Sequence, residues 1–213
     1  MKRPRVLLAD DHVIVAEGLR GLLEPEFDLV GIVQDGRALL SAAEKLRPDV
    51  IVADISMPLL NGIDAVRQIK KIHEEIKVVF LTMHPDVTYA VSALEAGALG
   101  YVLKHSAPAE LVAAIQSALR GKTYVTPLLA GELMQFYKKR PDQRDELTRL
   151  TPRQREVLQL LAEGRSAKDI ASVLKISPRT VEFHKYRIME DLGIKTVAEL
   201  VRYAINQGIS SQE

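Results

Sequence analysis

The chain of 213 residues contains no cysteine and no tryptophan, and only 5% of its residues are aromatic. Without cysteine it can form no disulfide and no thiolate metal site, which fits a protein of the reducing cytoplasm. No apolar run approaches the roughly 20 residues that a membrane-spanning helix needs, so we expect no membrane contact. The opening MKRPRVLLADDH has a short apolar stretch before two aspartates and predicts a buried strand rather than a signal peptide.

The chain also lacks an excess of charge of either sign, because it contains 29 Lys and Arg and 28 Asp and Glu. The charges are unevenly placed: residues 1–121 carry 13 basic and 16 acidic side chains, whereas residues 151–213 carry 10 and 8. A basic excess this small supports nucleic-acid binding only weakly. A hydrophobic content of 47% supplies a core and excludes wholesale disorder.

Apolar runs of strand length alternate with helical patterns through residues 1–121. The runs are rich in Val, Ile and Leu, as expected of parallel strands that helices cover on both faces. They are Arg5–Ala9, Leu29–Val33, Val50–Ile55, Val78–Leu81 and Gly100–Leu103. The alternation predicts an α/β fold with a doubly wound, five-stranded parallel sheet.

The remainder of the chain predicts a linker and a smaller all-α domain. Within residues 122–147, Pro127–Tyr137 predicts a connecting helix, and KKRPDQRDE at 138–146 predicts a flexible linker because it has no apolar side chain. In residues 148–213, capping boxes at Thr151 and Thr196 begin the first and last of four predicted helices.

Polar side chains follow the ends of the predicted strands. Asp10 and Asp11 follow the first strand, Asp54 ends the third, Thr82 the fourth and Lys104 the fifth. The carboxyl ends of parallel strands share one edge of a sheet, and ligands of doubly wound folds bind there. Taken singly, the aspartates could be helix caps or turn residues and the lysine a surface residue. Their joint placement at one edge favours a functional site.

Three neighbouring carboxylates stay ionised only when a cation neutralises them. All-oxygen ligands favour a hard divalent ion such as Mg²⁺, and Thr82 and Lys104 beside it would hold phosphoryl oxygens. The chemistry indicated is phosphoryl transfer to a carboxylate. Asp54 is the expected nucleophile because it lies between the acid pair and Lys104.

The stretches VLLADDH, DVIVADISMPLLNG, VVFLTMH and GYVLKHSAPAELVAAI resemble the receiver domain of two-component response regulators. The tail from LTPRQREVLQLL to TVAELVRYAI resembles the LuxR-type helix-turn-helix of the NarL/FixJ class. The resemblance implies a flavodoxin-like receiver at 1–121, a linker at 122–147 and a DNA-binding domain at 148–213. It also implies a transcription factor that is no standalone enzyme and only assists its own phosphorylation and dephosphorylation.

The resemblance further implies that Asp54 accepts a phosphoryl group from a phosphohistidine of a sensor histidine kinase. Asp11 and Asp54 would ligate Mg²⁺ directly, Asp10 would act largely through water, and the backbone carbonyl of Ser56 would complete the protein ligands. Residues of the family that bind phosphoryl oxygens and switch conformation correspond to Thr82, Lys104 and Tyr101. Residues that tune dephosphorylation correspond to Ser56 and His84.

The predicted helix Pro178–Leu192 is the candidate DNA-recognition helix, because one side of it is apolar and the other can enter a major groove. Base contacts are expected from its outward face, and phosphate contacts from basic residues on and around it. The candidate residues are Arg179, Thr180, Glu182, Phe183, Lys185, Tyr186, Arg187, Lys168 and Lys195. On pattern and charge alone, an ordinary helical interaction domain stays open. The helix at 196–207 is expected to pair with a second copy on promoter DNA, and RNA polymerase is a candidate partner.

Three other functions stay open. A hydrolase with an aspartyl nucleophile would want a second aspartate two residues after Asp54, where Ser56 stands. A constitutive DNA-binding protein would leave the strand-end cluster without a purpose. A flavin-binding head lacks a phosphate loop after the first strand.

Overall fold

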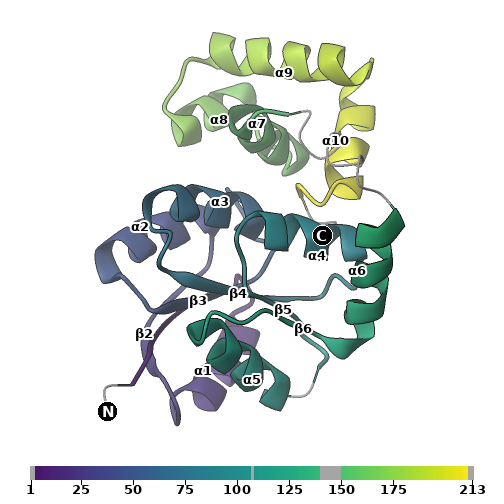
Figure 1. Cartoon of the computed structure of the whole chain (residues 1–213). Helices are drawn as coiled ribbons and strands as arrows, with labels where there is room; N and C mark the ends of the chain where they lie inside the picture. Colours follow the sequence, from purple (N-terminus) through teal and green to yellow (C-terminus); the bar gives the residue numbers. More distant parts are fainter. Residues whose placement is uncertain (1–2, 107, 140–149, 211–213) are drawn as a thin grey trace.

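The computed structural model describes residues 3–106, 108–139 and 150–210 (Figure 1). Its first part consists of β1 (Arg5–Ala9), α1 (Val13–Leu23), β2 (Asp28–Val33), α2 (Gly36–Leu46), β3 (Val50–Ala53), α3 (Gly62–Ile72), β4 (Lys77–Thr82), α4 (Val87–Glu95), β5 (Gly100–Leu103), α5 (Pro108–Leu119), β6 (Tyr124–Val125) and α6 (Pro127–Lys139). The tail consists of α7 (Pro152–Ala162), α8 (Ala167–Leu174), α9 (Pro178–Leu192) and α10 (Val197–Asn206).

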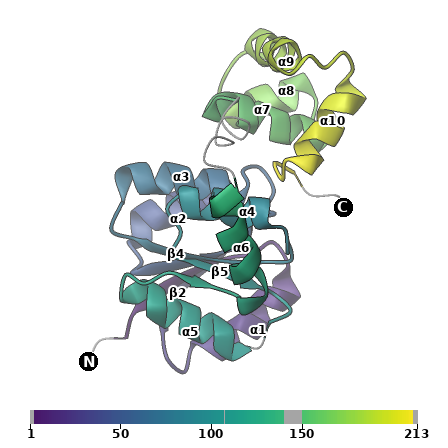
Figure 2. The ribbon, with the colours of Figure 1, turned by 45° about the vertical axis from the view of Figure 1, so that its right-hand side comes forward.

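The strands form one parallel sheet in the order β2-β1-β3-β4-β5-β6. Helices α1 and α5 cover one face, and α2, α3 and α4 cover the other (Figures 1 and 2). The strand order reverses at β1, which lies between β2 and β3, so polar residues after β1 and β3 meet at the switch point. The predicted doubly wound α/β fold is confirmed.

The predicted number of five strands is wrong, because β6 adds a sixth strand beside β5. It lies within the segment 122–147 that the sequence assigned to the linker, so the sheet continues past residue 121. A strand of two residues has too little length for a recognisable pattern.

The predicted connecting helix is α6, and it packs beside α4 (Figure 2). Leu129 and Leu133 of α6 are buried in the same apolar cluster as the α4 residues Ala90 and Val91. Of the predicted flexible stretch 138–146, the first two residues continue α6, and the others lie outside the described residues. No helix in the described part of the chain is long and apolar enough to cross a membrane.

The tail has its own core, formed by apolar residues of all four of its helices. The predicted capping boxes are present: Thr151 and Gln154 begin α7, and Thr196 and Glu199 begin α10. A third capping box at Ser166 begins α8. Such caps satisfy backbone N–H groups that a helix start leaves without partners.

The loop between β3 and α3 (residues 54–61, the β3–α3 loop) runs so close to two glycines that neither position has room for a side chain. A Cβ on Gly62 would lie 2.0 Å from the carbonyl oxygen of Asp54, and one on Gly36 would lie 1.9 Å from the carbonyl oxygen of Leu60. Both obstructing atoms belong to the backbone, so the loop itself would have to move.

We therefore expect Gly62→Ala to destabilise the fold by about 1–3 kcal/mol, the usual cost of overpacking. Gly131→Ala on α6 is the control, because a Cβ there would meet no atom of the described residues within 4 Å. Alanine stabilises a helix by about 1 kcal/mol relative to glycine, so this variant should be as stable as the wild type or more stable. Urea unfolding followed by circular dichroism measures both changes. An unfolding midpoint of Gly62→Ala equal to that of the wild type would contradict the close approach.

Candidate functional site

Asp10 and Asp11 lie directly after β1, at the carboxyl edge of the sheet. Asp10 is buried, and its Oδ1 accepts a hydrogen bond from the backbone N–H of His12 at 2.9 Å. Asp11 Oδ1 is buried and accepts no hydrogen bond from the described residues, and the ring Nδ1 of His12 lies 2.9 Å from it. A carboxylate oxygen left in this way is an available ligand atom.

Asp54 follows β3 at the same edge and contacts a lysine from two strands away. Lys104 Nζ lies 2.6 Å from Asp54 Oδ2 and 2.7 Å from Asp10 Oδ2. The other oxygen, Asp54 Oδ1, accepts the backbone N–H of Ile55 at 2.6 Å. One ammonium group thus bridges two buried carboxylates, as the placement of these residues at strand ends predicts.

The surroundings raise the pKa of both Asp54 and Lys104. Burial raises the pKa of Asp54, and the charge of Lys104 offsets this only in part. Burial would lower the pKa of Lys104, but the Asp54 charge and the hydrogen bonds to Asp10 and Asp54 outweigh it, so that pKa is raised. The two shifts have different causes: burial dominates at Asp54, and the neighbouring carboxylates dominate at Lys104. The edge of the sheet therefore has an excess of negative charge.

The donor set fits a hard divalent cation. One ligand atom each from Asp10, Asp11, His12 and Asp54 lies within 4.8 Å of the others. Three of the four are carboxylates, the ligands that Mg²⁺ prefers. The His12 side chain is mostly exposed, yet its ring nitrogen reaches this cluster.

Thr82 and Tyr101 are both buried and both bonded to the backbone of His84. The Thr82 Oγ1 accepts the His84 N–H at 3.3 Å, and the Tyr101 hydroxyl donates to the His84 carbonyl at 2.8 Å. The His84 ring stacks on Tyr89, and its Nε2 lies 2.7 Å from the Ser56 Oγ. Burial lowers the pKa of His84. These contacts join the end of β4 and the Tyr101 side chain of β5 to the β3–α3 loop.

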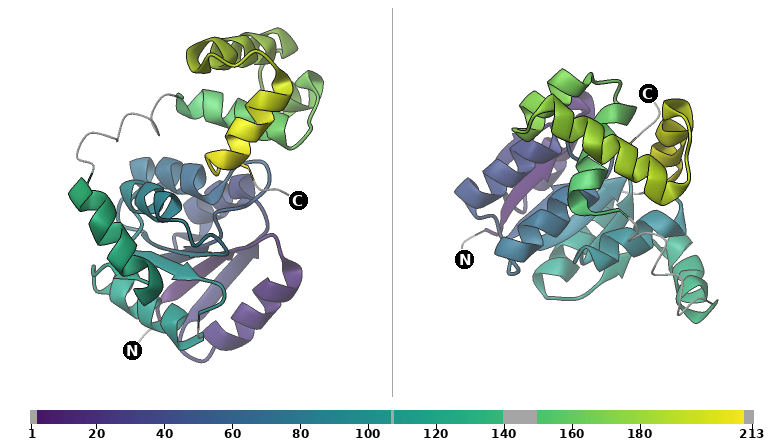
Figure 3. Two further views of the ribbon diagram at one scale, coloured as in Figure 1. Left: turned by 90° about the vertical axis from the view of Figure 1, so that its right-hand side faces the viewer. Right: turned by 90° about the horizontal axis from the view of Figure 1, so that it is seen from above.

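Helix α9 lies on the side of the tail that faces away from the sheet (Figure 3). Val181 and Ile188 are buried in the core of the tail, whereas Phe183 and Tyr186 are 60% and 63% exposed. Two further candidates, Lys185 and Glu182, pair with each other at 2.5 Å along the helix. The Lys185 Nζ also lies 5.0 Å from the centre of the Tyr186 ring.

The remaining candidates lie on α9 and on segments beside it. Arg187 pairs with Glu190 at 2.9 Å on the exposed side of α9. Arg179 is exposed and Thr180 Oγ1 lies 2.8 Å from Ser177 Oγ at the start of the helix. Lys168 and Lys195 are exposed on neighbouring segments.

Sequence reasoning missed the polar residues with which α7 contacts the β3–α3 loop. The buried amide of Gln159 contacts the backbone of Met57 and Asn61. Nothing in the helical pattern of α7 distinguishes Gln159 from a solvated residue, so a sequence signal for this contact is absent.

The acidic edge with its buried lysine belongs to a doubly wound sheet, and a separate helical domain follows that sheet. This combination indicates a response regulator that controls transcription. The family models agree with this assignment. A response regulator receiver domain matches residues 6–116, and the luxR family of bacterial regulatory proteins matches residues 148–204. The chain belongs to the two-component response regulators with a LuxR-type DNA-binding domain, and it is a transcription factor of the NarL/FixJ class.

Curated relatives match nearly end to end. The chain is 38% identical to the transcriptional regulatory protein MctR of Rhizobium johnstonii, over 98% of this chain and 96% of the relative. It is 35% identical to the oxygen regulatory protein NreC of Staphylococcus epidermidis, over 95% of this chain and 97% of the relative.

Solved structures show the same two-domain organisation. The RcsB response regulator of Salmonella typhimurium is 31% identical, with a TM-score of 0.65 over 97% of this chain and 99% of that one. A complex of RcsB with DNA is 30% identical, with a TM-score of 0.60 over 95% and 98% of the two chains.

The raised pKa of Asp54 predicts a dependence of stability on pH. The folded chain binds this proton more tightly than the unfolded chain, so the contribution is favourable at low pH and is lost as the pH rises through the raised pKa. We expect Asp54→Asn, which cannot ionise, to be more stable than the wild type at pH 7. The gain should shrink as the pH falls.

Urea unfolding between pH 4 and pH 8 measures this gain. Asp28→Asn is the control, because Asp28 is an exposed residue at the start of β2. A destabilised Asp54→Asn at pH 7 would show that the bond to Lys104 outweighs the cost of burying the charge.

Proposed function

We propose that Asp54 accepts a phosphoryl group from a phosphohistidine of a sensor histidine kinase, and that this controls binding of the tail to promoter DNA. The observation that carries the proposal is the convergence of Asp54, Asp10, Asp11 and Lys104 at one edge of the sheet. In the transfer, an Asp54 oxygen attacks phosphorus, the P–N bond breaks, and the histidine of the kinase leaves with the electron pair.

Residues of this chain would supply the groups that the transfer needs. Asp11, Asp54 and the Ser56 carbonyl would hold Mg²⁺ directly and Asp10 largely through water, and the ion would neutralise phosphoryl charge. Lys104, whose raised pKa keeps it charged, would bind a phosphoryl oxygen. The chain would thus assist its own phosphorylation and dephosphorylation.

The proposed switch runs through the shared contacts of His84. Thr82 would leave its hydrogen bond to the His84 N–H and turn to a phosphoryl oxygen, which frees the backbone that Tyr101 also binds. Phosphorylation then biases an equilibrium between two receiver conformations.

The proposed DNA interface is the outward face of α9, with base contacts from Arg179, Thr180, Glu182, Phe183 and Tyr186 and phosphate contacts from Lys168, Lys185, Arg187 and Lys195. The complex of the similar RcsB with DNA supports the use of this module on DNA. Helix α10 would pair two copies: Val197 is 46% exposed, and Val201 is only partly covered. RNA polymerase is a candidate contact of the bound dimer.

Phosphorylation predicts a measurable gain of mass. After incubation with Mg²⁺ and acetyl phosphate, the wild type should gain one phosphoryl group and Asp54→Asn none. Intact-mass spectrometry measures this, and hydroxylamine should release the group as expected of an acyl phosphate. Asp28→Asn is the control and should behave as the wild type. An unmodified wild type would favour the second candidate, a constitutive DNA-binding protein.

The DNA interface predicts two distinguishable kinds of variant. Lys168→Gln should weaken binding to all sequences and lower the slope of log K against log salt by about 0.9, the value for one phosphate contact. Glu182→Ala should leave that slope unchanged and reduce discrimination at one base pair by about 1–3 kcal/mol. Fluorescence anisotropy at several salt concentrations measures both, with Lys138→Gln on α6 as the control. A uniform loss for Glu182→Ala would contradict its role in reading bases.

A further inference from the structure

The tail exposes two aromatic side chains that lie next to each other on α9. Phe183 and Tyr186 are 60% and 63% exposed, whereas Tyr203, the third aromatic residue of the tail, is partly buried. Residues three positions apart are neighbours on the surface of a helix, and the buried Val181 and Ile188 mark the opposite side of α9. Apolar side chains that are exposed together, rather than singly, mark a binding surface.

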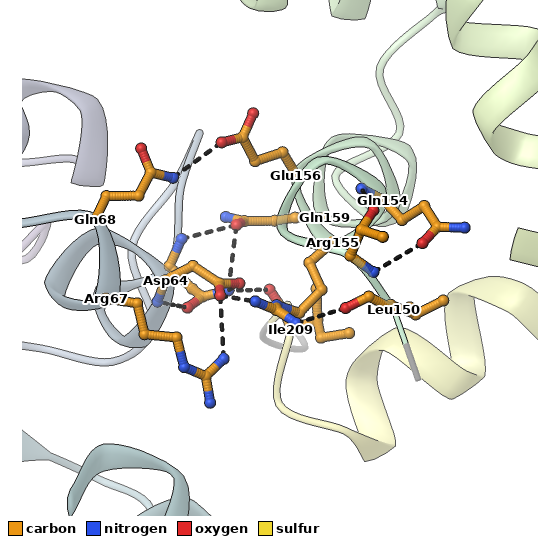
Figure 4. A network of polar contacts seen from close by, with 11 residues as sticks. Asp64, Arg67, Gln68, Leu150, Gln154, Arg155, Glu156, Gln159 and Ile209 are labelled. Atoms are coloured by element: carbon orange, nitrogen blue, oxygen red, sulfur yellow. Dashed lines mark hydrogen bonds and ion pairs between the residues drawn. The ribbon is translucent and has the colours of Figure 1, made fainter. Parts of the chain in front are cut away.

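Helix α9 presents this pair on the side of the tail that faces away from the receiver (Figure 3). The tail contacts the receiver through α7 instead. The Arg155 Nε lies 2.8 Å from Asp64 Oδ1 of α3, and the Gln159 Oε1 accepts the Asn61 N–H at 2.7 Å (Figure 4). The aromatic pair is therefore accessible even when the two domains are in contact.

Neighbouring side chains of α9 orient both rings. The Phe183 and His184 rings lie edge to face, with their centres 5.8 Å apart. The Lys185 Nζ lies 5.0 Å from the centre of the Tyr186 ring and is itself paired with Glu182. Side chains that are already oriented lose less conformational entropy when they bind a partner.

Helix α9 has little charge to offer to DNA phosphates. It carries three basic and three acidic side chains. Two of the basic residues, Lys185 and Arg187, are paired along the helix with Glu182 and Glu190. Attraction to phosphates depends on the number of basic side chains that neutralise them. The outward face of α9 is therefore distinguished by its apolar surface rather than by its charge.

The major groove of DNA offers one apolar group to such a surface. The base edges present hydrogen-bond donors and acceptors, and thymine adds a methyl group at C5. An aromatic ring placed against donors and acceptors would leave them without partners, which weakens binding. The same ring placed against a methyl group buries apolar area, which strengthens binding.

We propose that Phe183 and Tyr186 read C5 methyl groups in the major groove. Three residues advance a helix by about 4.5 Å, and base pairs follow one another every 3.4 Å or so, so the two rings contact neighbouring base pairs. The DNA sites of this regulator then carry thymine, or cytosine methylated at C5, at these two positions. This inference rests on the proposed function of the tail as a DNA-binding domain.

The test uses the full chain, treated with Mg²⁺ and acetyl phosphate, and a pool of random-sequence DNA duplexes as the probe. The duplex that binds most tightly is then prepared with uracil in place of one thymine at a time, because uracil lacks only the C5 methyl. We expect binding about fourfold weaker at each of two neighbouring positions, the effect of burying one methyl group. The ratio should not change with salt, because no phosphate contact is lost.

Variants assign each methyl group to one ring, and fluorescence anisotropy measures the affinities. Phe183→Ala should bind the thymine and uracil duplexes equally at one of the two positions, and Tyr186→Ala at the other. Tyr137→Ala, which removes an exposed aromatic side chain of α6, is the matched control and should keep the fourfold ratio. A purely structural role of either ring would weaken binding to both duplexes alike and leave the ratio unchanged.

Duplexes with cytosine and 5-methylcytosine at the same two positions distinguish the two sources of the methyl group. The added methyl should strengthen binding of the wild type about fourfold and leave binding of the matching alanine variant unchanged. The tighter of the thymine and 5-methylcytosine duplexes identifies the base that supplies the methyl group.

Equal binding of the thymine and uracil duplexes at every position overturns the inference and leaves DNA binding by the tail in place. This comparison uses the unchanged chain, so it does not depend on how the variants fold. A pool that yields no bound duplex overturns both the inference and the proposed DNA interface.

Discussion

Several carboxylates can be buried in their ionised form at one edge of a sheet only when a cation lies among them. Lys104 supplies one positive charge, whereas neutralising Asp10, Asp11 and Asp54 needs more than one. Its ammonium group bridges Asp54 and Asp10, while one oxygen of Asp11 accepts no hydrogen bond within the part of the chain that the structure describes. The residual negative charge explains why this edge fits a divalent ion and a phosphoryl group. The fold contributes by placing the carboxyl ends of β1, β3 and β5 at the same edge of the parallel sheet.

Contacts also run from the carboxyl edge of the sheet to the DNA-binding domain. The β3–α3 loop starts at Asp54, passes two glycines with no room for a side chain, and ends under α7. His84 links the end of β4 and Tyr101 of β5 to Ser56, and its ring stacks on Tyr89. A Cβ on Gly208, after α10, would lie 2.1 Å from the Tyr89 ring. Both contact routes run from the phosphoacceptor to the DNA-binding domain, whereas α9 stays outside them.

Much of the fold follows from periodicity, because buried parallel strands and capped helices leave strong local patterns. The ranges Arg5–Ala9, Gly100–Leu103 and Pro178–Leu192 agree with the structure to the residue. Strand-end positions also predicted the meeting of Asp10, Asp54 and Lys104. Strand β6 was missed because two residues carry no period. Gln159 was missed because a buried amide that binds another domain's backbone looks, in one sequence, like any polar helix residue.

Gln159 and Glu163 bind peptide groups of the loop rather than its side chains, and this has an evolutionary consequence. Peptide groups are common to all sequences, so Met57, Leu59 and Asn61 offer these partners through atoms that substitution does not remove. The two domains can accumulate changes separately as long as the loop keeps its backbone course and the tail keeps Gln159 in α7 and Glu163 directly after it. Recombination between related regulators would then preserve the interdomain contact more readily than a contact built from paired side chains.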